Sequence, residues 1–324
     1  MARRLSENGT DSYSGIGSIC GMLNIEKIEI TTLSENSVAD IYYVAEWGLS
    51  FHISVTGGPS ILFDTGFRQA CTYNAGVAGI RLSDVDMIVL SHGHSDHTGG
   101  LRSVLQQIQY EKPDRDHVDI LCHPAAIEPQ YVKHTDHYFY RGCPHTMEEL
   151  TGLGARFKTS SEPTWLTEDI VVSGEVPMKA EFESVAPICF LKKNGAYVSS
   201  PVDDDQALFF RTDKGLLVVS GCAHRGIINT IMHARALTGM EEVFMVIGGT
   251  HLLNTSPKQQ EKTLEALRTF GVERIGVSHC TGMKPAGYLS EHLGPEKFFF
   301  NNAGTGITFP DGKMKVNAFE KYNV

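Results

Sequence analysis

Residues 90–100 read LSHGHSDHTGG, and they follow an apolar run over residues 87–90 that is typical of a buried strand. Imidazole and carboxylate are the ligands that borderline divalent metals such as zinc prefer. Three imidazoles and an acid this close together would be costly to pack without a cation. The run therefore predicts a metal centre at a strand end; the alternative is that its histidines cap a helix or lie on a polar surface. The potential ligands are His92, His94, Asp96 and His97.

The spacing within this run suggests more than one metal position. In extended backbone, side chains two residues apart point to the same side, so the first two histidines and the aspartate share one side and the last histidine points to another. Residues 98–100 and the apolar-periodic LRSVLQQI that follows predict a tight turn into a helix over residues 100–109. A chain that bends after Ser95 would carry the last two ligands toward a neighbouring ion. The turn can therefore hold two metals.

Together with ILFDTG at residues 61–66, the run resembles the metallo-β-lactamase superfamily, whose members generally carry one or two zinc, iron or manganese ions. Later segments are similar to a subfamily labelled as 7,8-dihydropterin-6-yl-methyl-4-(β-D-ribofuranosyl)aminobenzene 5'-phosphate synthase-like. The resemblance spans approximately residue 25 to the C-terminus. These later segments are GEVPMKAEFE from Gly174, DDDQALFF from Asp203, GLLVVSGCAHRGIINT from Gly215, IGGTHL from Ile247 and SHCTG from Ser278.

Apolar β-rich segments alternate with helical ones along the chain. Strand hairpins with helices between them suit two sheets packed face to face and flanked by helices. This αββα sandwich is also the α/β fold that the resemblance implies, as a single metallo-β-lactamase-like domain over residues 25–324. Strands are predicted at residues 51–55, 60–64, 87–91, 119–123, 207–211, 215–220, 243–247 and 273–278, and helices at 100–109, 225–237 and 257–270, the last capped by Ser256.

Composition agrees with a soluble enzyme of one domain. The chain has 324 residues, 38 acidic against 28 basic side chains and a formal net charge of −10, so it lacks the electrostatic footprint of a general nucleic-acid binder. No apolar stretch approaches the ~20 residues that cross a bilayer. Residues 1–24 are polar at their start and lack the apolar core of a secretory signal, so we expect a flexible leader. We expect neither a nucleic acid nor a membrane as a partner. The chain could form a homo-oligomer.

The cysteines are odd in number and scattered, which favours a reduced, cytoplasmic protein. Two of them lie in the motifs, and the other five are expected to pack in the interior. Cys280 follows a strand end and is expected to point into the core, away from its neighbour His279. The seven are Cys20, Cys71, Cys122, Cys143, Cys189, Cys222 and Cys280.

Residues 128–146 mix histidines and aromatic residues without a sustained period. We expect a loop or broken helix there, a lid candidate over the site. The alternative is a surface excursion packed by its own rings. As a lid, the segment would offer His134, His137 and Tyr138 to the substrate, with His145 as a further candidate.

The remaining metal ligands must come from later strand ends. The buried strand GLLVVS breaks at Gly221 and places Cys222 and His224 just before a helix. The resemblance implies a bridging aspartate where Cys222 stands, and a histidine before this hairpin where the sequence reads PVDDDQAL. His224 would then complete a three-histidine set with the first two histidines of the run. His279 matches the superfamily's last metal histidine and would form the second site with Asp96 and His97, which Cys222 could join.

Supporting roles are predicted for several more residues. His251 is either a ligand or, as we favour, a substrate-facing proton donor or anion binder. Asp64 is expected to orient the histidine cluster by hydrogen bonds. Asp203 and Asp204 are expected on a surface turn, although either of them, or Asp205, could orient or donate a ligand.

Two adjacent divalent ions, zinc first and manganese or iron as alternatives, point to hydrolysis. A phosphoester best exploits two cations, so a small anionic molecule is the expected substrate. Asp96 could accept a proton from the nucleophile, and His251 could protonate the leaving group or hold the oxyanion. The alternatives are a pterin-linked phosphoribosyl transferase or synthase, a lactone or carboxyl-ester hydrolase, and a non-catalytic metal-dependent ligand-binding protein.

Overall fold

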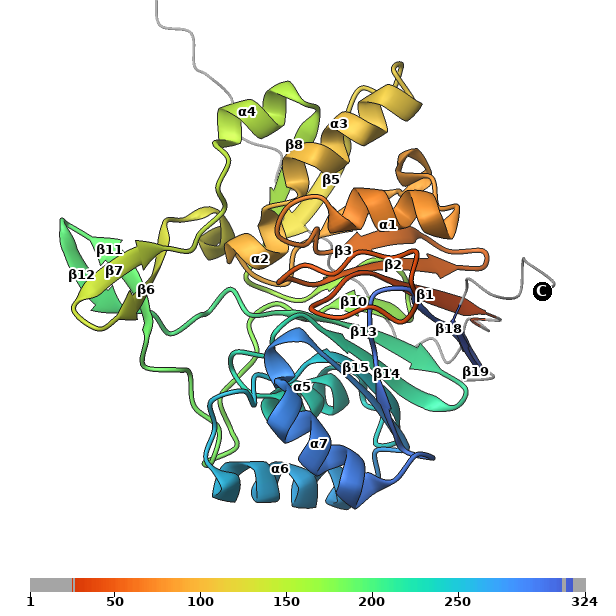
Figure 1. The fold of residues 1–324 in the computed structure, drawn as a ribbon, viewed down its shortest axis with the longest axis vertical. Coiled ribbons are helices and arrows are strands. Elements are labelled where there is room, and N and C mark those ends of the chain that lie inside the picture. Colours follow the sequence, from red (N-terminus) through yellow and green to blue (C-terminus); the bar gives the residue numbers. More distant parts are fainter. Residues whose placement is uncertain (1–24, 26, 311–312, 317–324) are drawn as a thin grey trace, which may run out of the picture.

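Two mixed β-sheets pack face to face between two layers of helices in the computed structural model, which describes residues 25, 27–310 and 313–316 (Figure 1). The αββα sandwich predicted from the sequence is thereby confirmed. The predicted leader over residues 1–24 lies outside the described residues. Within the described part of the chain, no helix is both long and apolar enough to cross a membrane.

The first sheet is antiparallel on one side and parallel on the other. Its strands follow the order β19 (Lys313–Val316), β18 (Thr305–Phe309), β1 (Ile28–Ser34), β2 (Ser50–Val55), β3 (Ser60–Phe63), β4 (Met87–Val89), β5 (Val118–Cys122) and β8 (Ala155–Thr159). The pairs from β3 to β8 are parallel. On the outer face lie α1 (Ala70–Ala78), α3 (Leu101–Glu111) and α4 (Met147–Gly152), with the short helices η1 (Leu82–Asp84), α2 (Ser95–Thr98) and η2 (Pro124–Ile127) in the connections.

The second sheet has the same mixed character. Its order is β17 (Phe298–Phe300), β16 (Arg274–Ser278), β15 (Val243–Gly249), β14 (Gly215–Ser220), β13 (Ala207–Thr212), β10 (Ile170–Val172) and β9 (Thr164–Trp165). The pairs from β14 to β17 are parallel. Its outer face carries α5 (Ile227–Thr238), α6 (Pro257–Thr269) and α7 (Met283–Leu293), and the turn η3 (His279–Thr281) follows β16. Ser256 caps α6 as predicted, since its side chain accepts a hydrogen bond from the Gln259 amide.

Strands of the second sheet are apolar on both faces because both faces are covered. In β13, Leu208 and Phe210 point into the core between the sheets, whereas Ala207 and Phe209 point toward the helices. The same alternation holds along β14. The inner core joins these residues to the apolar faces of β1, β2 and β3, and it fixes the two sheets against each other.

A third, four-stranded sheet projects from one side of the sandwich (Figure 1). We call it the arm: β12 (Ala196–Ser199), β11 (Cys189–Lys193), β6 (Gln130–His134) and β7 (His137–Tyr140). The loop or broken helix predicted for residues 128–146 is therefore wrong, because β6 and β7 form a hairpin that β11 extends. Aromatic rings gather on one side of the arm, where Tyr138 stacks on Tyr197 with ring centroids 3.8 Å apart.

Candidate metal centre

The predicted ligands lie where strands of the two sheets end. Asp64 follows β3, His92 and His94 follow β4, and ligands from the second sheet follow β14 and β16. Chain segments that leave the carboxyl ends of parallel strands gather at one rim of an α/β structure. Several of these segments turn sharply, with non-glycine residues in the left-handed region at φ between 49° and 59°: Asp64, Ala223, His251 and His279.

Ring nitrogens of three histidines converge on one point. The Nε2 atom of His92 lies 3.1 Å from Nδ1 of His94 and 3.2 Å from Nε2 of His224. Nδ1 of His92 lies 2.9 Å from the Ser91 hydroxyl, which donates its own proton to Asp64 Oδ2 at 2.6 Å. Ser91 must therefore accept the Nδ1 proton of His92. The Nε2 atom that faces the other two rings then carries a lone pair.

Hydrogen bonds orient a second group of candidate ligands in the same way. Nδ1 of His97 donates to Asp64 Oδ2 at 2.6 Å, so its Nε2 carries a lone pair. Nδ1 of His279 donates to Oδ1 of Asn36 at 2.9 Å, and that oxygen also accepts from the Gly48 amide. Nε2 of His279 is thus left facing Asp96 Oδ2 at 3.5 Å.

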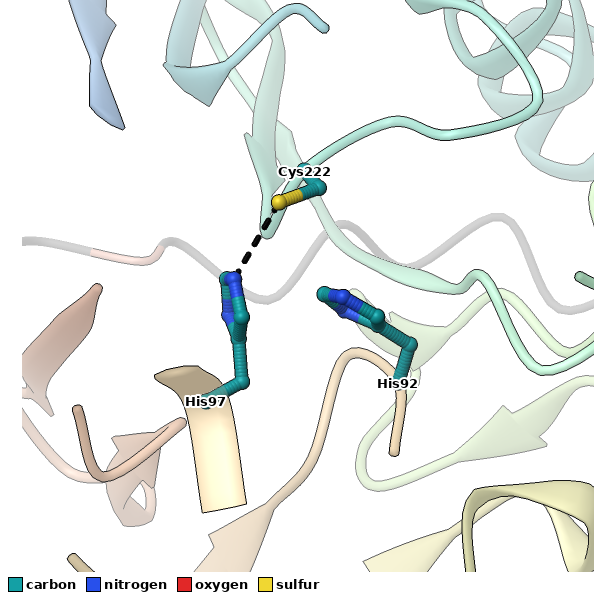
Figure 2. A group of neighbouring side chains, drawn as sticks. All are labelled: His92, His97 and Cys222. Atoms are coloured by element: carbon teal, nitrogen blue, oxygen red, sulfur yellow. Dashed lines mark hydrogen bonds between the residues drawn. The ribbon is translucent and has the colours of Figure 1, made fainter. Parts of the chain in front are cut away.

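Cys222 lies beside one ring from each group, His92 and His97, as Figure 2 shows. Its sulfur lies 3.1 Å from Nε2 of His97, and its ligand atom and those of His92 and His97 all lie within 4.8 Å of one another. Two further triads meet the same limit, so the donors form one continuous cluster. They are His92, His94 and His224, and Asp96, His97 and His279.

These residues fit divalent metal ions. With Zn–N bonds of about 2.0–2.1 Å, ligands at the corners of a tetrahedron lie roughly 3.3–3.4 Å apart, near the separations around His92. Among the described residues, Asp96 Oδ1 is buried without a hydrogen-bond partner. Buried polar atoms without partners are rare, and converging lone pairs repel one another. A cation would satisfy both conditions.

Burial and neighbouring charges set the protonation of the cluster. Burial, followed by the nearby histidines, holds the pKa values of His92 and His224 well below their usual range, so both rings stay neutral. Burial alone would raise the pKa of Asp96, but the contact with His279 and the neighbouring His97 and Arg141 hold it well below its usual range. Burial raises the pKa of the Cys222 thiol. Asp96 is thus an ionised, weakly basic carboxylate.

Several supporting residues were missed by sequence reasoning because no local motif marks them. Trp47 Nε1 and Arg141 Nη2 donate to Asp96 Oδ2 at 3.0 and 3.1 Å. Glu35 accepts from the backbone amide of His279 at 2.6 Å. Asn36, from the same loop, holds the His279 ring as described above.

The three aspartates before β13, Asp203, Asp204 and Asp205, only partly match the predicted surface turn. Asp203 is partly exposed and pairs with Arg225, whereas Asp204 is buried, so the surface position predicted for Asp204 is wrong. Asp204 Oδ2 accepts from the Gly93 amide and from the Gln130 side chain, both at 2.7 Å. It therefore fixes the loop that carries the first two histidines. Asp205 is also buried and accepts from the Arg225 amide.

A cavity of about 760 Å³ opens above the cluster. It is lined by ligands from both groups and by His251, whose ring centroid is 4.2 Å from that of His224. Burial, then the charges of His94 and His279, lowers the pKa of His251 to about 4, so its imidazole is neutral at pH 7.

The cavity wall differs from the predicted one. His134, His137 and Tyr138 do not line the cavity: the two histidines are exposed at the arm's tip, and Tyr138 packs on Tyr197. The arm instead contributes Val132, Phe139 and Cys189, and Arg141 lines the cavity just after β7. Strand alternation explains the difference, because Val132 pairs with Phe139 and the tyrosines point to the opposite face.

Cys280 is buried, as predicted, but on the side of the cavity. The chain leaves β16 in the turn η3, which places buried Cys280 in the cavity lining. Its thiol donates to the Cys222 carbonyl at 3.2 Å.

Comparisons with known proteins agree with this fold. Residues 49–159 match the family model of the metallo-β-lactamase superfamily. The 7,8-dihydropterin-6-methyl-4-(β-D-ribofuranosyl)-aminobenzene-5'-phosphate synthase of Methanocaldococcus jannaschii is 33% identical over 294 residues, which cover 88% of this chain and 98% of that protein.

Two solved structures share the architecture. Tm1679, a metal-dependent hydrolase of the β-lactamase superfamily, is 26% identical with a TM-score of 0.72, covering 86% of this chain and 98% of that one. The metallo-β-lactamase fold protein YhfI from Bacillus subtilis is 11% identical with a TM-score of 0.54, covering 87% and 99%. The sandwich, the ligand cluster at its rim and these similarities lead to one assignment: this chain belongs to the metallo-β-lactamase superfamily.

Proposed function

We propose that the protein is a hydrolase that binds two divalent ions, with zinc as the first choice, and cleaves a phosphoester of a small anionic molecule. The observation that carries the proposal is the convergence of two three-ligand groups at the floor of one cavity. His92, His94 and His224 would hold one ion, and Asp96, His97 and His279 the other. Cys222, within 4.8 Å of ligand atoms associated with both groups, would stand between them. Manganese or iron could replace zinc in such a nitrogen- and oxygen-rich set.

Ions bound there would activate a water molecule and neutralise charge that develops on a phosphoryl oxygen. The chain's own residues prepare the site for this chemistry. Asp64 fixes the ring of His97 directly and that of His92 through Ser91, which keeps both Nε2 lone pairs inward. Asp96 keeps its charge and would orient the attacking water more readily than it would store a proton, because its pKa is held low. His251 is neutral and would donate a hydrogen bond to the oxyanion.

Metal analysis combined with an ester panel tests the proposal. Purified metal-loaded protein should contain about two ions per chain and should hydrolyse phosphodiesters faster than lactones or carboxyl esters. His92→Ala should abolish turnover and lower metal content. His233→Ala, in α5 outside the cluster, should preserve both and serves as the control. Metal-loaded protein that turns over no member of the panel would refute the hydrolase assignment.

A second candidate is transfer of a phosphoribosyl group in pterin chemistry, supported by the 33% identity to the synthase across nearly all of that protein. This function requires the same cavity to hold a phosphoribosyl donor and an aminobenzene acceptor without rapid hydrolysis. Incubation with both compounds, followed by mass spectrometry, distinguishes the two functions. A covalent ribosyl–aminobenzene product, with release of the donor's leaving group, would favour transfer; ribose phosphate and the leaving group without that product would favour hydrolysis.

A further inference from the structure

Arg141 brings a fixed positive charge to the metal cluster. It follows β7 at the base of the arm and lines the cavity beside Trp47 and Phe139. Among the described residues that line this cavity, Arg141 is the sole lysine or arginine. The lining also contains the carboxylates Asp96 and Glu183. These carboxylates would repel an anionic ligand, so its binding would depend on the positive charge of Arg141 and of any bound metal ions.

The guanidinium group is only partly engaged by the protein. Nη2 donates to Asp96 Oδ2 at 3.1 Å. This is the one hydrogen bond that the Arg141 side chain makes with the described residues. A guanidinium carries five N–H donors in a planar fork. One-third of the side chain is exposed (33%), on the side of the cavity. Donors therefore remain for a ligand that approaches the Asp96 group.

The backbone of Arg141 is fixed on both sides. Its amide donates to the Gln130 carbonyl at 2.8 Å, and its carbonyl accepts from the Ser95 amide, in the ligand run itself, at 2.7 Å. The Gln130 side chain bonds Asp204, which in turn holds the Gly93 amide. Arg141 is thus tied to the same loop that carries the first ligands. A side chain whose backbone is held in this way needs less ordering when a ligand binds.

From this placement we infer that Arg141 is a specificity-determining residue that donates to a phosphoryl oxygen of the substrate. The inference rests on the proposed function and narrows it. Arginine matches phosphate geometry with two parallel N–H groups, whereas a neutral carboxyl ester or lactone offers no charge to pair with. Trp47 donates to the same Asp96 oxygen as Arg141 does, so the indole and the guanidinium group meet at this carboxylate. Arg141 would therefore select phosphoesters.

Binding of inorganic phosphate to the metal-loaded protein tests the inference without requiring turnover. By calorimetry, Arg141→Met should weaken phosphate binding at least about tenfold, and Arg141→Lys should weaken it less. Arg211→Met is a matched control, because Arg211 is 36% exposed and lies 3.7 Å from the buried carboxylate of Asp169 outside the cavity. Unchanged phosphate binding in Arg141→Met would overturn the inference. Loss of bound metal in that variant would also overturn it, since Arg141 would then serve Asp96 alone.

Turnover gives a second, independent measurement. Arg141→Met should lower kcat/KM for a phosphodiester by about 100-fold and for a carboxyl ester by less than about tenfold, because the lost bond to Asp96 affects both substrates and the lost phosphoryl contact affects one. Equal losses on both substrates would refute a role in selectivity. Failure of the wild-type protein to hydrolyse any ester would refute the proposed function, yet the phosphate-binding result would still decide the role of Arg141.

Discussion

Asp64→Asn isolates the hydrogen bonds that support the cluster. Asp64 is fully buried and has a φ of 59°, a conformation that asparagine adopts with little strain. Its Oδ1 accepts from the Ser91 amide at 2.7 Å, and its Oδ2 accepts from the Ser91 hydroxyl and from His97 Nδ1, both at 2.6 Å. The substitution keeps the shape of the side chain and removes its charge. Its effects can therefore be assigned to the lost charge and hydrogen bonding rather than to a change of shape.

The magnitude follows from these contacts. If the amide nitrogen of the new asparagine takes the Oδ2 position, it places a donor against the donor Nδ1 of His97. If the nitrogen takes the Oδ1 position, it places a donor against the backbone N–H of Ser91. Either orientation loses at least one hydrogen bond to a charged group, which contributes about 1.5–3 kcal/mol. Loss of a hydrogen bond that orients a metal ligand weakens metal binding by about 10–100-fold, or roughly 1.4–2.7 kcal/mol. The two magnitudes agree.

Competition with a chromophoric chelator at neutral pH measures this effect. Asp64→Asn should weaken zinc binding by about 10–100-fold, chiefly at the ion that His97 would hold. Asp86→Asn is the control, because Asp86 also accepts a backbone hydrogen bond, from Ser60, but on the exposed surface. If Asp64→Asn bound zinc within about threefold of the wild type, the orienting role of Asp64 would be refuted.

Three further predictions concern sulfur, pH and packing. Cobalt-loaded protein should show a thiolate-to-metal absorption band that Cys222→Ser loses and Cys280→Ser keeps; a band lost in neither variant would exclude Cys222 as a ligand. Folding lowers the pKa of His251 from 6.5 to about 4, so the unfolded chain binds a proton that the folded one does not, and stability falls as the pH drops through this window. In metal-free protein, His251→Gln should reduce the loss of unfolding free energy between pH 7 and pH 4 by on the order of 3 kcal/mol. Urea unfolding at several pH values measures this, and parallel pH dependences of the variant and the wild type would contradict it. Gly99→Ala should cost about 1–3 kcal/mol or more, since its Cβ would lie 2.1 Å from the Phe67 carbonyl oxygen, while Gly76→Ala in α1 has open space and should cost nothing; thermal melts compare the two.

The strand ends and their ligands could be predicted because their signals are local. The run at residues 90–100 contains both the ligands and the turn that separates them, and α2 begins at Ser95 where the bend was expected. Each later candidate ligand follows an apolar run that can be recognised as a strand from its own sequence. The structure brings His224 next to His92 and His94, and His279 next to Asp96 and His97, in the groups expected from the sequence.

The arm and its arginine could not be predicted for the opposite reason. β6 pairs with β11, a strand more than fifty residues later, and no local pattern encodes that pairing. Aromatic residues occupy both faces of β7, which hides the period of two. Arg141 is a single cation outside any motif, and its position follows only from the pairing. Asp204 was misplaced because its burial depends on the distant Gly93 amide.

Each proposed ion would draw its ligands from both sheets, and this has a consequence for the life of the protein in a cell. His92 and His224 are separated by 132 positions in the chain. Bonds to an ion across such a distance exist only in the folded chain, so metal binding stabilises the fold, by about 4 kcal/mol when the free ion is at 1,000 times its Kd. The ions would thus tether one layer of the sandwich to the other. Metal starvation would then lower the amount of protein through unfolding and proteolysis, and recovery would require new synthesis as well as new metal.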